Sequence, residues 1–135
     1  MRRSALVLAA LLAATAPAAA AELKVVGQAG FLGEWELEAT VTERLDNGAQ
    51  QFVGPLRLTH VGLCTADGPE EKSGELRLHL SEKRASVRAT LLIDGAECSY
   101  NGELKDGYRG VMSCPDRRAV PVMMWVKEDS VIGDR

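Results

Sequence analysis

Residues 34–42 alternate strictly between apolar and polar side chains, and this alternation constrains the fold more than any other feature of the chain. Trp35, Leu37, Ala39 and Val41 fall on one side, and glutamates and threonines occupy the positions between them. A period of two with one charged side is typical of a β-strand that faces a core and water at once. The pattern therefore predicts a half-buried strand, beside which other strands should pair.

Similar alternation recurs along the chain, in segments separated by turn residues, and nothing after residue 21 has the periodicity of a helix. The expected strands cover residues 22–27 (weakly), 34–43, 49–60, 74–80, 86–93, 96–104, 108–114 and 119–127. These segments predict an all-β, antiparallel up-and-down meander of about eight strands. A closed or nearly closed barrel is favoured because closure removes unpaired strand edges; a β-sandwich is the alternative.

Turn residues fix the register of the longest hairpin. Asn47-Gly48 favours a two-residue turn, since both central residues of a type I′ turn need a positive φ. That turn places Asp46 opposite Ala49. Counting outward from it, Trp35 lies opposite His60, and the apolar sides of the two strands coincide.

Two further hairpins bear on the three cysteines of the chain, Cys64, Cys98 and Cys114. An odd number allows one bridge and one thiol, with three possible pairings. Asp94-Gly95 predicts a two-residue turn, and 105–107 predicts a three-residue loop with glycine last. The second register sets Cys98 directly opposite Cys114, within disulfide reach. We therefore predict a Cys98–Cys114 disulfide and a free thiol at Cys64; the other pairings would instead tie the segment 62–73, an expected loop, to a strand.

The first 21 residues predict a secretory signal peptide. Arg2 and Arg3 precede an uncharged apolar run, and small residues lead to a cleavage point near Ala21. The run is too short to span a bilayer. We therefore expect a periplasmic or extracellular protein, with residues 22–135 forming a single β-barrel domain.

The charge and hydropathy of the remaining chain exclude some partners. Without the two arginines of residues 1–21, a segment that holds no acidic residue, the net charge of −3 becomes −5. Nucleic acid and anionic membrane surfaces are therefore poor candidates as partners. No second apolar segment is long enough for a membrane span.

The tripeptide Gly33-Glu34-Trp35, at the start of the first long strand, resembles the Gly-x-Trp signature of the calycin superfamily, the lipocalins and their relatives. The resemblance implies an antiparallel barrel, which in many members holds a small apolar ligand or inhibits another protein. In lipocalins the tryptophan packs under a basic residue of the last strand. Lys127 is the residue that could take this part here.

Four inward or aromatic residues are candidates for ligand contact: Trp35, His60, Tyr100 and Trp125. The first long strand and the last strand can be neighbours in a closed barrel, so the two tryptophans could share a wall. Core packing is the alternative for both tryptophans, and a half-buried imidazole stacked on Trp35 is the alternative for His60.

The sequence offers little chemistry. Glu34, Glu36 and Glu38 share one side of a strand, as in a solvated face. His60 and Cys64 lack the closely spaced partners of a metal site, and no nucleophile with a base at a motif spacing occurs. We expect no metal, no cofactor and no catalysis.

The leading hypothesis is a non-catalytic periplasmic or secreted barrel that binds an unknown small apolar ligand or a protein partner. The loop 62–73 and the outer face of the last strand are the surfaces through which a protein partner would be met. A structural, envelope-associated protein without a ligand is the alternative, and a thiol-dependent activity at Cys64 is a third hypothesis.

Overall fold

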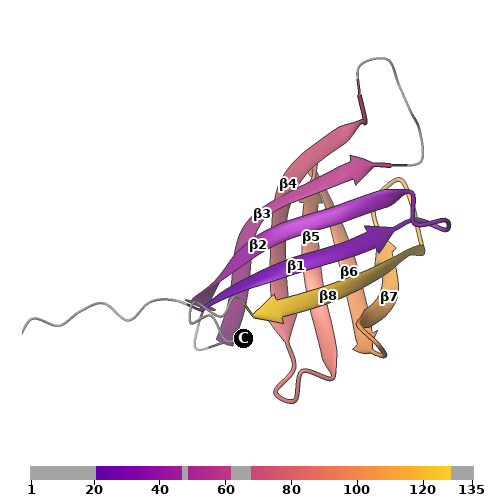
Figure 1. Cartoon of the computed structure of the whole chain (residues 1–135). Helices are drawn as coiled ribbons and strands as arrows, with labels where there is room; N and C mark the ends of the chain where they lie inside the picture. Colours follow the sequence, from indigo (N-terminus) through magenta and orange to yellow (C-terminus); the bar gives the residue numbers. More distant parts are fainter. Residues whose placement is uncertain (1–20, 47–48, 62–67, 129–135) are drawn as a thin grey trace, which may run out of the picture.

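The computed structural model describes residues 21–46, 49–61 and 68–128, and this part of the chain forms a closed antiparallel barrel (Figure 1). Its strands follow one another around the barrel in chain order, and β1 pairs with β8 to close it. The strands are β1 (Glu22–Ala29), β2 (Trp35–Asp46), β3 (Ala49–His60), β4 (Glu71–Leu80), β5 (Ser86–Ile93), β6 (Ala96–Leu104), β7 (Tyr108–Ser113) and β8 (Val120–Glu128). The barrel prediction is confirmed, and the sandwich alternative is wrong.

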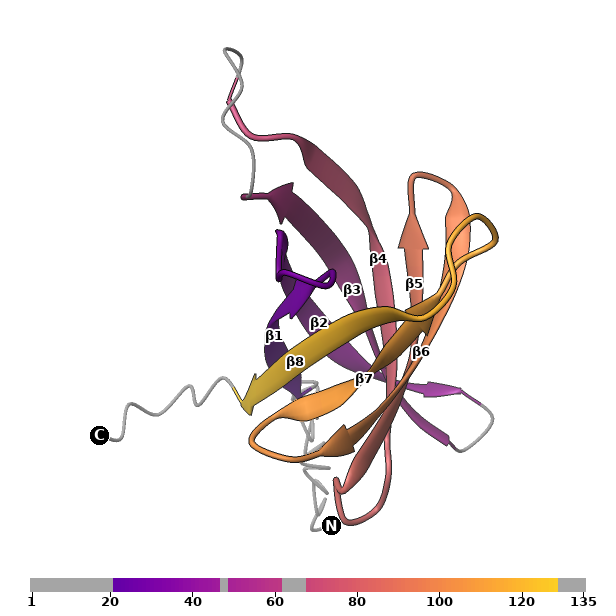
Figure 2. The ribbon, with the colours of Figure 1, turned by 90° about the vertical axis from the view of Figure 1, so that its right-hand side faces the viewer.

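The weak first strand is a full member of the barrel. β1 pairs over its whole length with β2 on one side, and with β8 on the other side from Leu23 to Ala29. Figure 2 shows β8 lying along β1 at this closure. No helix long and apolar enough to cross a membrane occurs in the residues placed by the structure.

The predicted hairpin registers are confirmed. Trp35 pairs with His60, and the same ladder continues to Asp46 opposite Ala49. In the second hairpin, Asp94 and Gly95 both have positive φ (50° and 82°), as a type I′ turn requires. The third hairpin, around residues 105–107, keeps the predicted ladder as well.

The fourth strand begins earlier than predicted. β4 starts at Glu71, which pairs with Thr59, so residues 71–73 belong to the strand and not to the expected loop 62–73. The inward and outward alternation of β4 continues back to Lys72, whose side chain lies on the inner side of the strand. The charges of Glu71 and Lys72 hide this alternation in the sequence. Cys64, the predicted free thiol, lies outside the residues that the structure describes.

Inward side chains fill most of the barrel. The most buried are Leu23, Val25, Val41, Phe52, Leu76, Leu78, Leu91, Cys98, Tyr100 and Met124. Tyr100 is 1% exposed, and its hydroxyl lies 3.1 Å from the carbonyl oxygen of Tyr108 and 3.2 Å from that of Val122, to which it donates. This shared hydrogen bond ties β6 to β7 and β8 across the interior.

Two inward glycines allow neighbouring strands to approach closely. A Cβ at Gly110 would collide with the carbonyl oxygen of Asn101, and one at Gly54 would collide with that of Thr40. Both obstacles are backbone atoms, which cannot rotate away. These positions therefore permit the tight curvature of the barrel.

We expect Gly110→Ala to lower the free energy of unfolding by about 1–3 kcal/mol, because the added methyl group must displace the backbone of β6. Urea unfolding measures this loss. Ser113→Ala, on an exposed position of the same strand, is the matched control and should change stability by less than about 0.5 kcal/mol. Equal midpoints for Gly110→Ala and wild type would contradict the close approach of β6 and β7.

The two tyrosines of the chain should titrate above their ordinary pKa. Burial raises the pKa of Tyr100 to about 12. Burial also raises the pKa of Tyr108, against the nearby charge of Arg84, which lowers it. Because the unfolded chain loses these protons first, stability should be constant below the ordinary value of 10.0 and fall as pH rises toward about 12.

Tyrosinate absorbance as a function of pH tests this prediction directly. Tyr100→Phe should remove the higher of the two transitions and leave that of Tyr108. Two transitions at the ordinary pKa of tyrosine would show that both rings are solvated, contrary to the structure.

Candidate functional site

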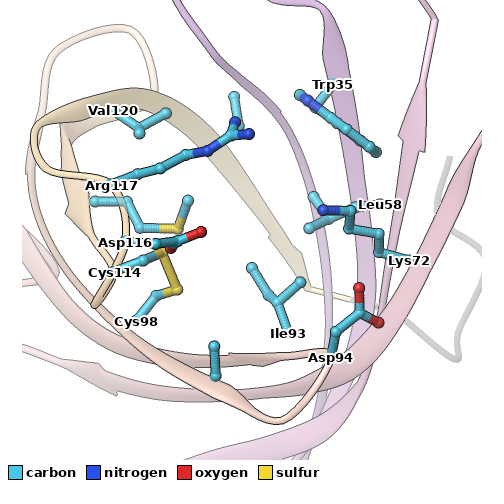
Figure 3. Close-up of a pocket in the computed structure, with 13 residues that line it drawn as sticks. Trp35, Leu58, Lys72, Ile93, Asp94, Cys98, Cys114, Asp116, Arg117 and Val120 are labelled. Carbon is cyan, nitrogen blue, oxygen red and sulfur yellow. A yellow bond between two sulfur atoms is a disulfide. The ribbon is translucent and has the colours of Figure 1, made fainter.

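One end of the barrel contains a pocket of about 300 Å³. This end, which we call the Trp35 end, carries the β1–β2 loop, the β5–β6 turn and the β7–β8 loop; the first and last of these lie at the right of Figure 1. Most of the lining is apolar: Ala29, Trp35, Leu58, Ile93, Ala96, Cys98, Met112, Cys114 and Val120. Four charged residues complete it: Lys72, Asp94, Asp116 and Arg117 (Figure 3).

Trp35 forms one wall of the pocket. His60 packs edge-on against it, with ring centroids 4.6 Å apart and an interplanar angle of 82°, as the register of β2 and β3 dictates. The ammonium nitrogen of Lys72 lies over the indole, 5.2 Å from the ring centroid. This is a cation–π arrangement, in which the negative face of the ring attracts the charge.

The basic residue over Trp35 is therefore Lys72 of β4 and not Lys127 of the last strand. Trp35 pairs with Ala29 at the end of β1, and Ala29 pairs in turn with Val122 of β8. Lys127 instead pairs with Lys24, near the start of β1. The pairing of β1 with β8 thus places Lys127 toward the opposite end of the barrel. This corrects the part that the calycin resemblance suggested for it.

The predicted disulfide forms part of the opposite wall. Cys98 and Cys114 are bonded, with Cα atoms 4.3 Å apart. Cys114 and Arg117 exchange backbone hydrogen bonds of 2.6 and 3.2 Å, which close the turn that carries Asp116. The bridge thereby fixes this turn, and Arg117 points from it across the pocket toward Trp35 (Figure 3).

Glu34 organises the loop beside the pocket. Its carboxylate accepts a hydrogen bond of 3.0 Å from the backbone of Leu32. The pKa of Glu34 is lowered mainly by backbone N–H groups, its own and that of Leu32. Desolvation opposes this effect, and the charges of His60 and Arg117 lower the pKa further. The ionised carboxylate thus joins the loop electrostatically to the rim.

The other glutamates of the alternating segment face outward. Glu38 forms an exposed ion pair of 2.7 Å with Arg57. The hydrogen bond and the charge of Arg57 lower the pKa of Glu38. Glu36 is also exposed, so the carboxylates of β2 do not converge on a common point inside the barrel. Among the residues described, no group of three or more His, Cys, Asp or Glu side chains is arranged to hold a metal ion.

The four predicted ligand-contacting residues occupy four different environments. Trp35 lines the pocket, and His60 packs against it. Tyr100 lies in the packed interior, and Trp125 is 36% exposed on the outer face of β8. The expectation that the two tryptophans are neighbours is wrong, because β1 lies between β2 and β8.

Sequence reasoning missed the charged rim. Lys72 falls within the expected loop 62–73, although its spacing from Leu76 and Leu78 continues the inward alternation. Asp94 belongs to a predicted turn, and Asp116 lies between the predicted strands 108–114 and 119–127. Nothing in the local sequence indicates that these turns and Lys72 meet around one opening, because that depends on the closure of the barrel.

Comparison with known proteins adds no family. No protein-family model matches the chain, and no curated protein is significantly similar to it. The eight-stranded antiparallel barrel is compatible with a calycin-like architecture. The resemblance thus rests on this architecture and on Gly33-Glu34-Trp35.

Removing the disulfide should lower the free energy of unfolding by about 3 kcal/mol, because its cysteines are 16 residues apart and the bridge restricts the unfolded chain. Urea unfolding of Cys98→Ser/Cys114→Ser measures this loss. Ser99→Ala, at an exposed position of β6, is the control and should change stability by less than about 0.5 kcal/mol. Alkylation of the unreduced, unfolded wild type should label one cysteine; labelling of all three would contradict the bridge.

Proposed function

We propose that this protein is a non-catalytic periplasmic or secreted binding protein that takes a small, largely apolar molecule into the pocket at the Trp35 end. The observation that supports this most strongly is that one part of the barrel interior is filled by side chains and another part is open. Large side chains pack the interior around Tyr100 and Phe52, whereas about 300 Å³ remains open between Trp35 and the disulfide.

The size and lining of the pocket suit a compact ligand. Pockets for small molecules commonly have volumes of about 300–1,000 Å³ and are lined mainly by apolar groups with a few polar ones. The indole of Trp35 offers a flat apolar surface, and Ile93 and Val120 offer aliphatic ones. A ligand of one or two rings, or a short branched chain, matches this space.

The charged rim favours a ligand with a polar end. Lys72 and Arg117 provide cationic donors at the opening, and Asp94 and Asp116 provide acceptors. A ligand whose apolar body lies against Trp35 would leave its polar group at this level, within reach of the rim and of water. Apolar burial then supplies affinity and the rim selects orientation.

Export is part of the proposal. It is supported by the signal-peptide pattern of residues 1–21 and by the Cys98–Cys114 bridge, because structural disulfides persist in oxidising compartments. The absence of catalysis is likewise a proposal, supported by the exposed position of Glu36 and Glu38, neither of which lines the pocket.

A structural role without a ligand is the second candidate. The packed interior favours it, since a barrel that stores ligands throughout its lumen would not fill that lumen with Tyr100, Phe52 and leucines. In this alternative the pocket is only the shallow end of a filled barrel.

Tryptophan fluorescence distinguishes the two candidates, because the chain has two tryptophans on opposite sides of the wall. Trp125→Phe leaves Trp35 in the pocket as the reporter, and Trp35→Phe leaves Trp125 on the outer face. We expect the apolar probe 8-anilinonaphthalene-1-sulfonate to quench Trp35 saturably, with a much smaller effect on Trp125. Ala96→Phe, which adds a ring to the pocket wall, should weaken the quenching about tenfold or more.

Equal, unsaturable quenching of both reporters would contradict a pocket that binds small molecules and would favour the structural role. If Trp35 alone is quenched saturably, native mass spectrometry of protein purified from its own compartment gives the mass of the natural ligand.

A further inference from the structure

The β1–β2 loop presents large apolar side chains to solvent. Phe31 is 79% exposed and Leu32 is 93% exposed, and Val61, just after β3, is 48% exposed. The backbone of Val61 donates a hydrogen bond of 2.8 Å to Glu34, which holds it beside this loop. We call Phe31, Leu32 and Val61 the apolar tip. Single exposed apolar residues are common on protein surfaces, whereas a cluster of large ones marks a contact site.

The loop that carries the tip is fixed to the barrel. Gly30 donates a hydrogen bond of 2.9 Å to the carbonyl oxygen of Pro121 in β8, and Gly33 donates one of 3.2 Å back to Gly30. Both glycines have positive φ, 104° and 64°, which other residues rarely adopt. The exposed side chains therefore sit on a defined backbone, so that ordering this loop on binding costs little conformational entropy.

The tip and the pocket lie at the same end of the barrel. Trp35 of the pocket wall directly follows the loop, and Val120 of the lining is next to Pro121, to which the loop is hydrogen-bonded. One end thus carries a convex apolar feature and a concave apolar feature. A two-fold interface uses the same patch on both copies, so such a patch must contain both shapes.

The charges around the opening also suit a second copy. Two cations, Lys72 and Arg117, and two anions, Asp94 and Asp116, surround the pocket. Within the described ranges none of the four forms a salt bridge shorter than 4.0 Å, although Lys72 lies over Trp35 and the charge of Arg117 acts on Glu34. A rim of one sign would repel its own copy, whereas this balanced rim can pair with itself. It also lacks the basic excess by which proteins bind anionic lipid.

We propose that, when the pocket holds no ligand, two copies of this protein associate through their Trp35 ends, and the apolar tip of each copy fills the pocket of the other. Each pocket then receives Phe31 or Leu32 from the partner copy, and the four rim charges of one copy face those of the other. A small molecule in the pocket competes with the partner's tip. The association requires only the tip and the pocket, and it does not depend on whether a natural small ligand exists.

Sedimentation velocity of the exported chain over a wide concentration range measures the association. Wild type should show a concentration-dependent monomer–dimer equilibrium. Leu32→Asp should raise the dimer Kd about 100-fold or more, because both copies lose a central contact. Ala96→Phe, which keeps the tip but fills the pocket, should do the same. Leu104→Asp, at a 51% exposed position near the other end, is the matched control and should leave the Kd unchanged.

A mixture of the two defective variants tests reciprocity. Leu32→Asp retains its pocket and Ala96→Phe retains its tip, so the mixture should form a heterodimer with one tip seated in one pocket, although each variant alone is monomeric. The tyrosine titration confirms that each variant keeps the fold.

Three results would overturn the proposal. They are a wild type that remains monomeric throughout the range, an unchanged Kd for Leu32→Asp, and a mixture without heterodimer. A monomer that instead sediments with phosphatidylcholine vesicles, in a manner lost in Leu32→Asp, would also overturn it and assign the tip to a lipid surface.

Discussion

Seven Cα pairs join β1 to β8, from Leu23 opposite Glu128 to Ala29 opposite Val122, and they convert an open meander into a barrel. The other strand pairs are all formed between neighbours in the sequence, so they would exist in an open sheet as well. Closure alone brings the β1–β2 loop against β8, through the hydrogen bond between Gly30 and Pro121. It also places the β7–β8 turn across the opening from Trp35. The pocket, its rim and the anchoring of the β1–β2 loop to β8 are therefore consequences of one pairing between distant parts of the chain.

The sequence contains enough information to predict the hairpins. Asn47-Gly48 and Asp94-Gly95 permit few turn geometries, and each turn determines every pair in the ladder beyond it. The Cys98–Cys114 bridge follows in the same way from the loop at residues 105–107, and the structure confirms it. These features are predictable because each depends on local turn chemistry and a period of two.

The parts of the site that escaped prediction depend on longer distances. Whether Tyr100 lines a cavity or fills it depends on the carbonyl groups of Tyr108 and Val122, which approach it only in the closed barrel. The pocket exists because small groups, Ala29, Ala96 and the disulfide, meet at one level of the interior. The sequence of a single strand does not indicate that these small groups lie at the same level. The inward position of Lys72 is likewise not predicted, because a charged side chain is expected to face water. Trp125 was equally ambiguous, since β8 is apolar on both sides.

The closure has a consequence for the order of events during biogenesis. The bridge lies within one hairpin, so oxidation needs only residues 98–114 to be accessible. Leu23, by contrast, pairs with Glu128, more than one hundred positions later in the chain. The second edge of β1 therefore stays unpaired until β8 is available. A chain that emerges with its amino end first, as it does during synthesis, cannot complete this barrel until almost its entire length is available. Formation of the Cys98–Cys114 bridge can therefore precede the final closure of the sheet.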